Sequence, residues 1–278
     1  MVGGPAQDLV TVVVPVWDAH VRYLDAALRS VCAQCPAPRV LVVDNRSTAP
    51  VSVPAGVRLV RLPERVSVGK ARTYGLAAVA TPFVVFWDAD DVMPAGALAA
   101  LLAAARAVPG AVLACGRIVE ADGVLHHWPR PRLTRTVARA PGPCAAVGAV
   151  SSLVPAIGAV IRTAAVRDAG GFPDLDTGDD WVVGVLLSLR GRLLLIDEVT
   201  RIYRRHPDAV WPRSSGRVQL LAHCAAVRAA LVADPRTPAW LRRGLPLLAA
   251  AQWLIVTLAR PCARRVRRAR AAMTRADG

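Results

Sequence analysis

The stretch at residues 83–91 reads Phe-Val-Val-Phe-Trp-Asp-Ala-Asp-Asp. Its first five residues are apolar without alternation, a pattern typical of a strand buried on both faces of a parallel sheet that helices cover. Three carboxylates follow within four positions. Ligands of open α/β sheets bind beyond the carboxyl ends of the strands, so these acids lie where a cation could neutralise them. The alternative is a solvated acidic turn in which Asp91 caps a helix that begins near Pro94.

The segments on both sides of this stretch alternate between strand and helix patterns. Strand patterns occupy residues 9–16, 39–43, 57–61, 111–119, 156–162, 192–196 and 200–203. Helix patterns occupy residues 21–34, 68–80, 95–107, 181–189, 216–233 and 238–259, and residues 126–145 are loop-like. This order predicts an α/β fold with a mixed, mainly parallel central sheet flanked by helices. We expect one domain at residues 1–210 and a helical, basic C-terminal extension at 211–278.

The chain has 278 residues, a formal net charge of +15 and a mean hydropathy of +0.38. This charge indicates an anionic partner, although a general preference for arginine would also produce it. Nucleic acid is not favoured, because no zinc-finger spacing and no aromatic RNA-binding motif is present. Cys32 and Cys35 form a C-x-x-C without a second pair or a nearby histidine, so no zinc site is indicated. The N-terminus lacks a secretory pattern, so we expect a cytoplasmic protein.

The C-terminal segment combines an apolar helix pattern with a cationic run. Residues 245–258 are largely apolar but are interrupted by Pro246, Gln252 and Thr257, so they do not predict a membrane span. Seven arginines follow between residues 260 and 275. The region 245–275 is therefore suited to peripheral contact with an anionic surface on the inner face of the cell membrane. The alternative is a helix packed on the domain and followed by a solvated basic tail.

Seven segments, in their order and spacing, resemble the family 2 glycosyltransferases, which have the GT-A (Rossmann-like) fold. These segments are Val12–Val16, Val42–Ser47, Gly69–Leu76, Asp88–Asp91, Gly170–Pro173, Gly178–Trp181 and Tyr203–Pro207. The resemblance covers roughly residues 9–210. It implies an inverting enzyme of glycan or cell-envelope biosynthesis that moves a sugar from a nucleotide-diphospho-sugar, with UDP-sugar expected, to a hydroxyl acceptor. The acceptor is not indicated by any motif.

The resemblance also implies which residues bind the donor. They are Pro15, Val16, Asp44, Lys70, Arg72, Asp88, Ala89 and Asp90. Asp44 would accept a hydrogen bond from the base, and Lys70 and Arg72 would bind the diphosphate near a helix start. The alternatives are an Asx-type turn at Asp44 and a solvated helix face at Lys70 and Arg72. Arg46 stands where many relatives have glycine.

The metal and the catalytic base are likewise implied by the resemblance. Asp88 and Asp90 match the two acids of a D-x-D motif, the first near the ribose or a metal-bound water, the second on Mg²⁺ or Mn²⁺. His206 matches a histidine that completes the metal site or contacts the diphosphate; the alternative is a structural histidine. Asp180 is the expected base, with Asp179 as the second candidate, because a carboxylate at a helix N-terminus stays ionised. Helix capping is the alternative for this pair.

Three other functions are compatible with parts of this sequence. A sugar-nucleotide pyrophosphorylase would need a glycine-rich loop after the first strand, where this chain has residues 15–18, Pro-Val-Trp-Asp. A non-catalytic scaffold with the transferase fold, or a protein that binds nucleic acid or an anionic surface, remains the alternative. The presence of Asp88, Asp90 and Asp180 counts against a scaffold.

Overall fold

The structure is a computed structural model that describes residues 9–120, 141–152, 154–208, 216–254 and 257. Within these residues, one sheet has the strand order β3-β2-β1-β4-β6-β5-β7. The strands are β1 Val10–Val16, β2 Arg39–Asp44, β3 Arg58–Arg61, β4 Phe83–Phe86, β5 Ala111–Glu120, β6 Val160–Arg162 and β7 Arg192–Tyr203. Strand β6 is antiparallel to both of its neighbours and all other pairs are parallel. The predicted mixed, mainly parallel sheet is therefore confirmed.

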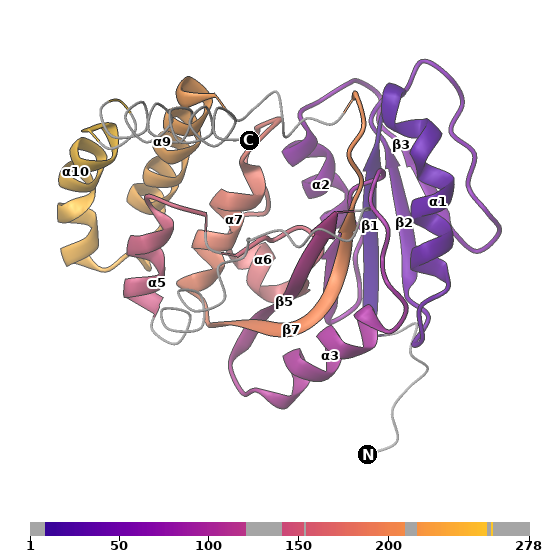
Figure 1. Ribbon diagram of the computed structural model, residues 1–278, viewed down its shortest axis with the longest axis horizontal. Coiled ribbons are helices and arrows are strands. Elements are labelled where there is room, and N and C mark those ends of the chain that lie inside the picture. The colour runs from indigo at the N-terminus through magenta and orange to yellow at the C-terminus, as the bar shows by residue number, and fades with distance from the viewer. Residues whose placement is uncertain (1–8, 121–140, 153, 209–215, 255–256, 258–278) are drawn as a thin grey trace, which may run out of the picture.

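Helices cover both faces of this sheet (Figure 1). They are α1 Val21–Cys32, α2 Val68–Ala77, α3 Ala97–Ala107, α5 Pro141–Gly148, α6 Thr163–Asp168, α7 Asp179–Ser188, α9 Arg217–Ala233 and α10 Ala239–Leu254, and a 3₁₀ turn, Asp18–His20, precedes α1. Successive strand side chains point to opposite faces. Val12 and Val14 accordingly pack in a cluster with α1 and α3, whereas Val13 packs in a second cluster with α2, α6 and α7. Burial on both faces explains the continuous apolar runs in the sequence.

The carboxyl ends of three parallel strands meet at one edge of the sheet. Strands β2 and β3 extend to one side of β1, and β4 lies on its other side. The register pairs Val16 with Asp44 and Val13 with Phe86, so the segments after β1, β2 and β4 emerge together. This reversal of strand order is where open α/β sheets bind ligands. Helix α2 lies close to this part of the sheet because Gly75 faces Val13 and has no side chain to obstruct it.

Two strands differ from the sequence expectation. Residues 192–203 form one long strand with register irregularities opposite β5, not two short strands. Residues 197–199, which separate the two predicted strands, are exposed and lie at a register irregularity within this single strand. Strand β6 has only three residues, because Gly158 adopts a left-handed φ of +79° that interrupts the extended chain.

Two helix starts also differ from expectation. Helix α3 begins at Ala97 after Gly96, and Asp91 is not its cap. Residues 141–148, expected as part of a loop, form α5, because prolines are tolerated in the first turn of a helix. The rest of the expected loop, residues 121–140, lies outside the described residues.

Helices α9 and α10 pack on the domain through α5 and α7 (Figure 1). Their shared apolar cluster includes Trp181, Val185, Cys224, Leu231 and Leu241. The predicted helical nature of this region is confirmed as far as residue 254, while the division at residue 210 stays a prediction. Among the described residues, no helix has both the length and the apolar character that crossing a membrane requires.

Candidate active site

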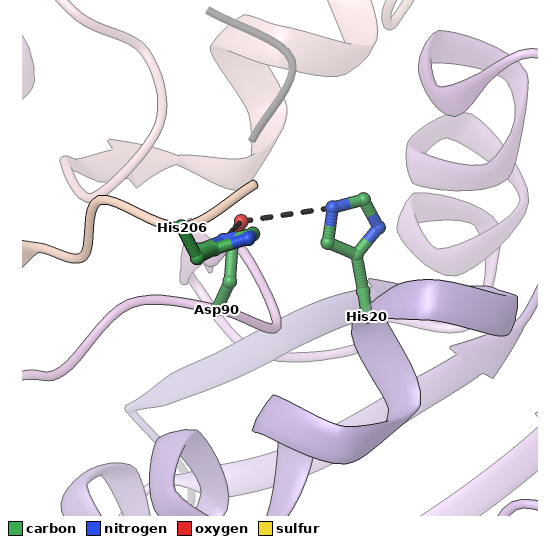
Figure 2. A group of neighbouring side chains, drawn as sticks. All are labelled: His20, Asp90 and His206. Carbon is green, nitrogen blue, oxygen red and sulfur yellow. Dashed lines mark hydrogen bonds and ion pairs between the residues drawn. The ribbon is translucent and has the colours of Figure 1, made fainter. Parts of the chain in front are cut away.

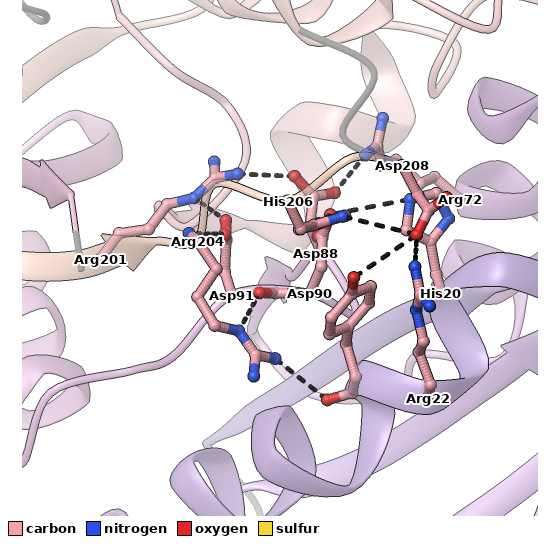
Figure 3. Close-up of polar contacts among 11 residues, drawn as sticks. His20, Arg22, Arg72, Asp88, Asp90, Asp91, Arg201, Arg204, His206 and Asp208 are labelled. Carbon is pink, nitrogen blue, oxygen red and sulfur yellow. Dashed lines mark hydrogen bonds and ion pairs between the residues drawn. The ribbon is translucent and has the colours of Figure 1, made fainter.

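The acids after β4 face two arginines and a histidine that come from the end of β7 and the segment after it. An isolated bridge joins Val92 to Ile202 and brings these two segments together. Arg201 lies within β7, and Arg204 and His206 follow it. Figure 3 shows these side chains converging on the turn at residues 88–91.

Asp88 is held between two buried guanidinium groups. Its Oδ1 accepts a hydrogen bond from Arg72 at 2.6 Å, and its Oδ2 accepts one from Arg201 at 2.6 Å. Burial opposes ionisation of Asp88, but Arg201 and Arg72 hold its pKa below the usual range. The first acid of the predicted D-x-D motif is therefore ionised and has both oxygens paired with protein cations.

Asp91 is fully buried and is also paired with Arg201 through an ion pair to Oδ2. The backbone N–H of Arg204 donates to Oδ1 of Asp91 at 3.3 Å. Burial raises the pKa of Asp91 to about 7, against the effect of Arg201 and with that of Asp88 and Asp90. Asp91, a helix cap in the alternative interpretation of the sequence, is thus an internal anchor for β7.

Asp90 faces two imidazoles instead of an arginine. Its Oδ2 lies 2.9 Å from Nε2 of His206 and 3.7 Å from Nε2 of His20 (Figure 2). One ligand atom from each residue lies within 4.8 Å of the other two, so the three could hold a metal ion. Asp88, Asp90 and Asp91 form a second group that meets the same distance condition, but arginines engage two of its three carboxylates.

Asp179 and Asp180 open α7 beside Arg72. Asp179 is buried and forms an ion pair with Arg72. Asp180 is half-buried, and its Oδ1 accepts a hydrogen bond from the N–H of Trp181 at 2.8 Å. Burial and then the charge of Asp179 raise the pKa of Asp180 to about 6, while Arg72 lowers it. The expectation that a carboxylate at this helix N-terminus stays ionised therefore depends on pH, because burial outweighs the effect of the helix terminus.

The turn after β2 uses the Asp44 carboxylate internally. Oδ1 of Asp44 accepts from the N–H of Ser47 at 2.8 Å, and Oδ2 lies 3.1 Å from Arg61. Its side chain is 1% exposed. This arrangement is the Asx-type turn that the sequence left open as the alternative. Arg46 keeps the turn with a left-handed φ of 62°, a conformation that favours the glycine of many relatives.

The start of α2 does not present free amide groups to a phosphate. The N–H groups of residues 68, 69 and 70 bond to Asp176, to the carbonyl of Leu175 and to Ser67, respectively. The half-exposed ammonium group of Lys70 lies 2.8 Å from Asp174. Arg72, one turn further, points to Asp88 and is the residue of this helix that reaches the candidate site.

The structure places the other predicted donor-binding residues at the same edge of the sheet. Pro15 and Val16 end β1 next to β2, and Ala89 lies buried between Asp88 and Asp90, the two acids of the predicted D-x-D motif. Sequence reasoning missed His20 and Arg201. No local sequence pattern marks either residue as part of a site. The strand order brings His20 to Asp90 and Arg201 to Asp88.

Comparison with known proteins agrees with this arrangement. The sequence model described as "Glycosyl transferase family 2" matches residues 11–149, half of the chain. The pre-mycofactocin glycosyltransferase of Mycobacterium tuberculosis is 30% identical over 187 residues, which cover 64% of this chain and 38% of that protein. An uncharacterized glycosyltransferase of Mycobacterium bovis is 40% identical over 128 residues, 45% of this chain and 54% of that protein. The chain thus matches only about half, or less, of the length of these curated relatives.

Two solved structures have the same GT-A fold. S. aureus TarS 1-349 in complex with UDP-GlcNAc gives a TM-score of 0.63 at 17% identity and covers 85% of this chain and 70% of that chain. A mannosyltransferase from Pyrobaculum calidifontis in complex with GDP-Man and Mn²⁺ gives 0.61 at 22% identity and covers 97% and 75%. With the family match, the sheet order and the acids after β4, the chain belongs to glycosyl transferase family 2.

Proposed function

We propose that this protein is an inverting glycosyltransferase that moves a sugar from a UDP-sugar to a hydroxyl acceptor. The observation that carries the proposal is the convergence of Asp88 and Asp90 with Arg72, Asp180 and His206 at the carboxyl ends of β1, β2 and β4. A scaffold without activity would not need buried, strongly charged residues at this edge, because each costs desolvation energy.

The donor would lie at the ends of β1 and β2, with its diphosphate beside the D-x-D turn. Arg72 and Arg201 keep Asp88 ionised and fix the orientation of the turn, since each donates to a different oxygen of Asp88. Pro15, Val16 and Asp44 would line the base side. Because Asp44 is turned inward, base recognition through its carboxylate requires this turn to rearrange when the donor binds.

Asp180 would act as the base. Its pKa of about 6 leaves the carboxylate mostly ionised at neutral pH while keeping it basic enough to take the proton of an acceptor hydroxyl. Asp179 would act indirectly, because its ion pair with Arg72 ties the start of α7, where the base lies, to the residue that also holds Asp88. A single base opposite the leaving group is the requirement of an inverting transfer.

Asp90 and His206 would hold a divalent cation, Mn²⁺ or Mg²⁺. The donor set fits such an ion, because the Asp90 carboxylate has no arginine partner among the described residues and lies against imidazole nitrogen. Nδ1 of His206 is buried and, among the described residues, has no hydrogen-bond partner. The bound cation would neutralise negative charge on the departing nucleoside diphosphate.

A panel of nucleotide sugars tests this proposal. UDP-, GDP- and dTDP-sugars, each with Mn²⁺ or Mg²⁺, are scored by the shift in melting temperature and by release of the nucleoside diphosphate into water. We expect stabilisation and slow hydrolysis with UDP-sugars. Selective response to GDP-sugars would overturn the assignment of the base, and no response to any nucleotide would favour the scaffold alternative.

We further propose that the protein contacts an anionic membrane surface through the region 245–275. The outward side of α10 exposes large apolar side chains beside exposed Arg242 and Arg243; these are Trp240, Leu247, Trp253 and Leu254, with Leu247 76% exposed. An apolar face flanked by cations suits the interface of an anionic bilayer. The arginines between 260 and 275 lie outside the described residues.

Cosedimentation with vesicles tests this contact. Vesicles that contain phosphatidylglycerol should bind the protein more strongly than neutral vesicles, and Leu247→Ser with Trp253→Ser should reduce binding. Val218→Ser is the matched control, because Val218 is an exposed apolar residue on α9. Equal binding by all variants would contradict a role for α10.

A further inference from the structure

We propose that His20 is a third protein ligand of the cation and that the resulting set, Asp90 with His20 and His206, selects a transition-metal ion such as Mn²⁺ over Mg²⁺. This inference rests on the proposed function, which places the cation on Asp90 and His206. The resemblance to the family does not indicate His20 as a ligand, but the position of His20 beside Asp90 in the fold does (Figure 2).

The backbone before α1 directs His20 towards Asp90. The N–H of His20 bonds to the carbonyl of Trp17 at 2.9 Å, and its buried ring packs edge-on against the Trp17 ring at 5.4 Å. Asp18 adopts a strained φ of 29° within this 3₁₀ turn. Its Oδ1 accepts from both the N–H and the hydroxyl of Thr48 at 2.8 Å, which ties the turn to the segment after β2. The imidazole is therefore positioned by the fold.

The three ligand atoms are close to the separation that one ion requires. Ligand atoms about 2.1 Å from a common ion lie about 3–4 Å apart. Oδ2 of Asp90 lies 2.9 Å from Nε2 of His206 and 3.7 Å from Nε2 of His20, and all three atoms lie within 4.8 Å of one another. Only a small inward movement would be needed to enclose an ion.

The neighbouring acids are poor competitors for this ion. Arg72 and Arg201 engage both oxygens of Asp88, and Arg201 also pairs with Asp91. Asp90 is thus the one carboxylate of the D-x-D turn without an arginine ion pair among the described residues. The ligands that remain beside it are the two imidazoles.

A carboxylate also lies near the other ring nitrogen of His206. A histidine that ligates through Nε2 carries its proton on Nδ1 and almost always donates it to a carboxylate, a backbone carbonyl or water. Nδ1 of His206 is buried without a hydrogen-bond partner in the described part of the chain, and Oδ2 of Asp208 lies 3.9 Å away. Arg22 and the hydroxyl of Tyr23 hold this oxygen of Asp208 from the start of α1 (Figure 3). His206 is therefore set up to ligate through Nε2.

This donor set determines which ion fits. Mg²⁺ demands oxygen ligands in near-ideal octahedral geometry and gives up water reluctantly. Imidazole nitrogen suits transition-metal ions, and affinity for such sites rises along the first-row series from Mn²⁺ to Cu²⁺. Two imidazoles to one carboxylate therefore disfavour Mg²⁺.

Electron paramagnetic resonance of Mn²⁺ tests the proposal on the full chain, with Mn²⁺ alone and with Mn²⁺ plus UDP. The loss of the free-ion signal gives the affinity, and pulsed measurements report nitrogen couplings from imidazole. We expect His20→Ala to weaken Mn²⁺ binding at least about tenfold, as expected for loss of a ligand or its support, and to remove part of the nitrogen coupling. An equal concentration of Mg²⁺ should not displace Mn²⁺ from the wild type.

The controls separate this inference from the proposed function. His223→Ala removes an imidazole that bonds to Thr177 and Gln219 outside the cluster, so its Mn²⁺ affinity should equal that of the wild type. If His20→Ala does not fold, as judged by circular dichroism, His20→Asn tests the same loss of nitrogen coupling. Unchanged affinity and coupling on loss of His20, with binding lost in Asp90→Asn, would overturn the inference alone. Mn²⁺ binding in Asp90→Asn equal to that of the wild type would overturn the proposed cation site as well.

Discussion

Replacing Arg201 with methionine should destabilise the fold strongly, because Arg201 compensates two buried carboxylates. Its guanidinium group forms ion pairs with Asp91 and, at 2.6 Å, with Asp88, and donates to the carbonyl of Ile157 at 3.3 Å. The Asp91 side chain is 1% exposed. Removal of one partner from a buried ion pair costs about 3–5 kcal/mol, since the remaining charge is uncompensated. We expect the free energy of unfolding of Arg201→Met to fall by that amount at pH 8.

The loss of unfolding free energy in Arg201→Met should depend on pH, because it depends on the ionisation of Asp91. The pKa of Asp91 is about 7 in the fold, against the ordinary value of 3.8 that applies to the unfolded chain. The wild type therefore loses stability as pH rises from about 4 to 7, where only the folded form holds this proton, and then levels off. Without Arg201 the Asp91 pKa rises further, so the decline continues above pH 7 at up to about 1.4 kcal/mol per pH unit. The difference between wild type and variant should thus grow from pH 6 to pH 8.

Urea unfolding followed by circular dichroism at pH 6, 7 and 8 measures this difference. The double variant Arg201→Met with Asp91→Asn is the matched control: it removes the uncompensated charge of Asp91 and should recover part of the loss. A loss below about 1 kcal/mol that is the same at pH 6 and pH 8 would refute the reasoning, because a buried pair of this kind should exceed an exposed one.

Two further predictions concern the base and the turn after β2. Asp180→Asn should slow donor hydrolysis by about 10²–10⁴-fold while nucleotide binding persists. The wild-type rate should rise with pH to a plateau, with a midpoint near pH 6, because the base must be ionised. A wild-type rate that stays flat down to pH 4 would argue against Asp180. Arg46→Gly should leave stability unchanged or raise it by up to about 1 kcal/mol in thermal unfolding, whereas Arg46→Val should lower it, because a β-branched residue fits a φ of 62° poorly; equal melting temperatures would contradict this.

The layers of the fold could be predicted from the sequence, because a strand buried on both faces has a continuous apolar sequence. The runs at 10–16 and 83–86 lack polar alternation, and the structure places them at the centre of the sheet. The acids after β4 were readable for the same reason, since an apolar strand that ends in carboxylates marks the ligand-binding edge.

The side chains that contact these acids could not be predicted from the sequence. Arg201 lies on a strand whose continuity depends on a bulge opposite β5, and His20 lies in a 3₁₀ turn that a strained Asp18 shapes. Both reach the site only through long-range packing, with more than 60 residues of chain between each and its acidic partner. Local propensity contains no information about such pairs.

The central claim is that Asp90 holds the cation that the donor needs. The most direct measurement is release of nucleoside diphosphate from a UDP-sugar at pH 7.5, as Mn²⁺ is titrated into wild type and Asp90→Asn. We predict Mn²⁺-dependent release by the wild type and its loss in Asp90→Asn, with the same urea unfolding midpoint within error. Release by Asp90→Asn at the wild-type rate and Mn²⁺ dependence would contradict the claim.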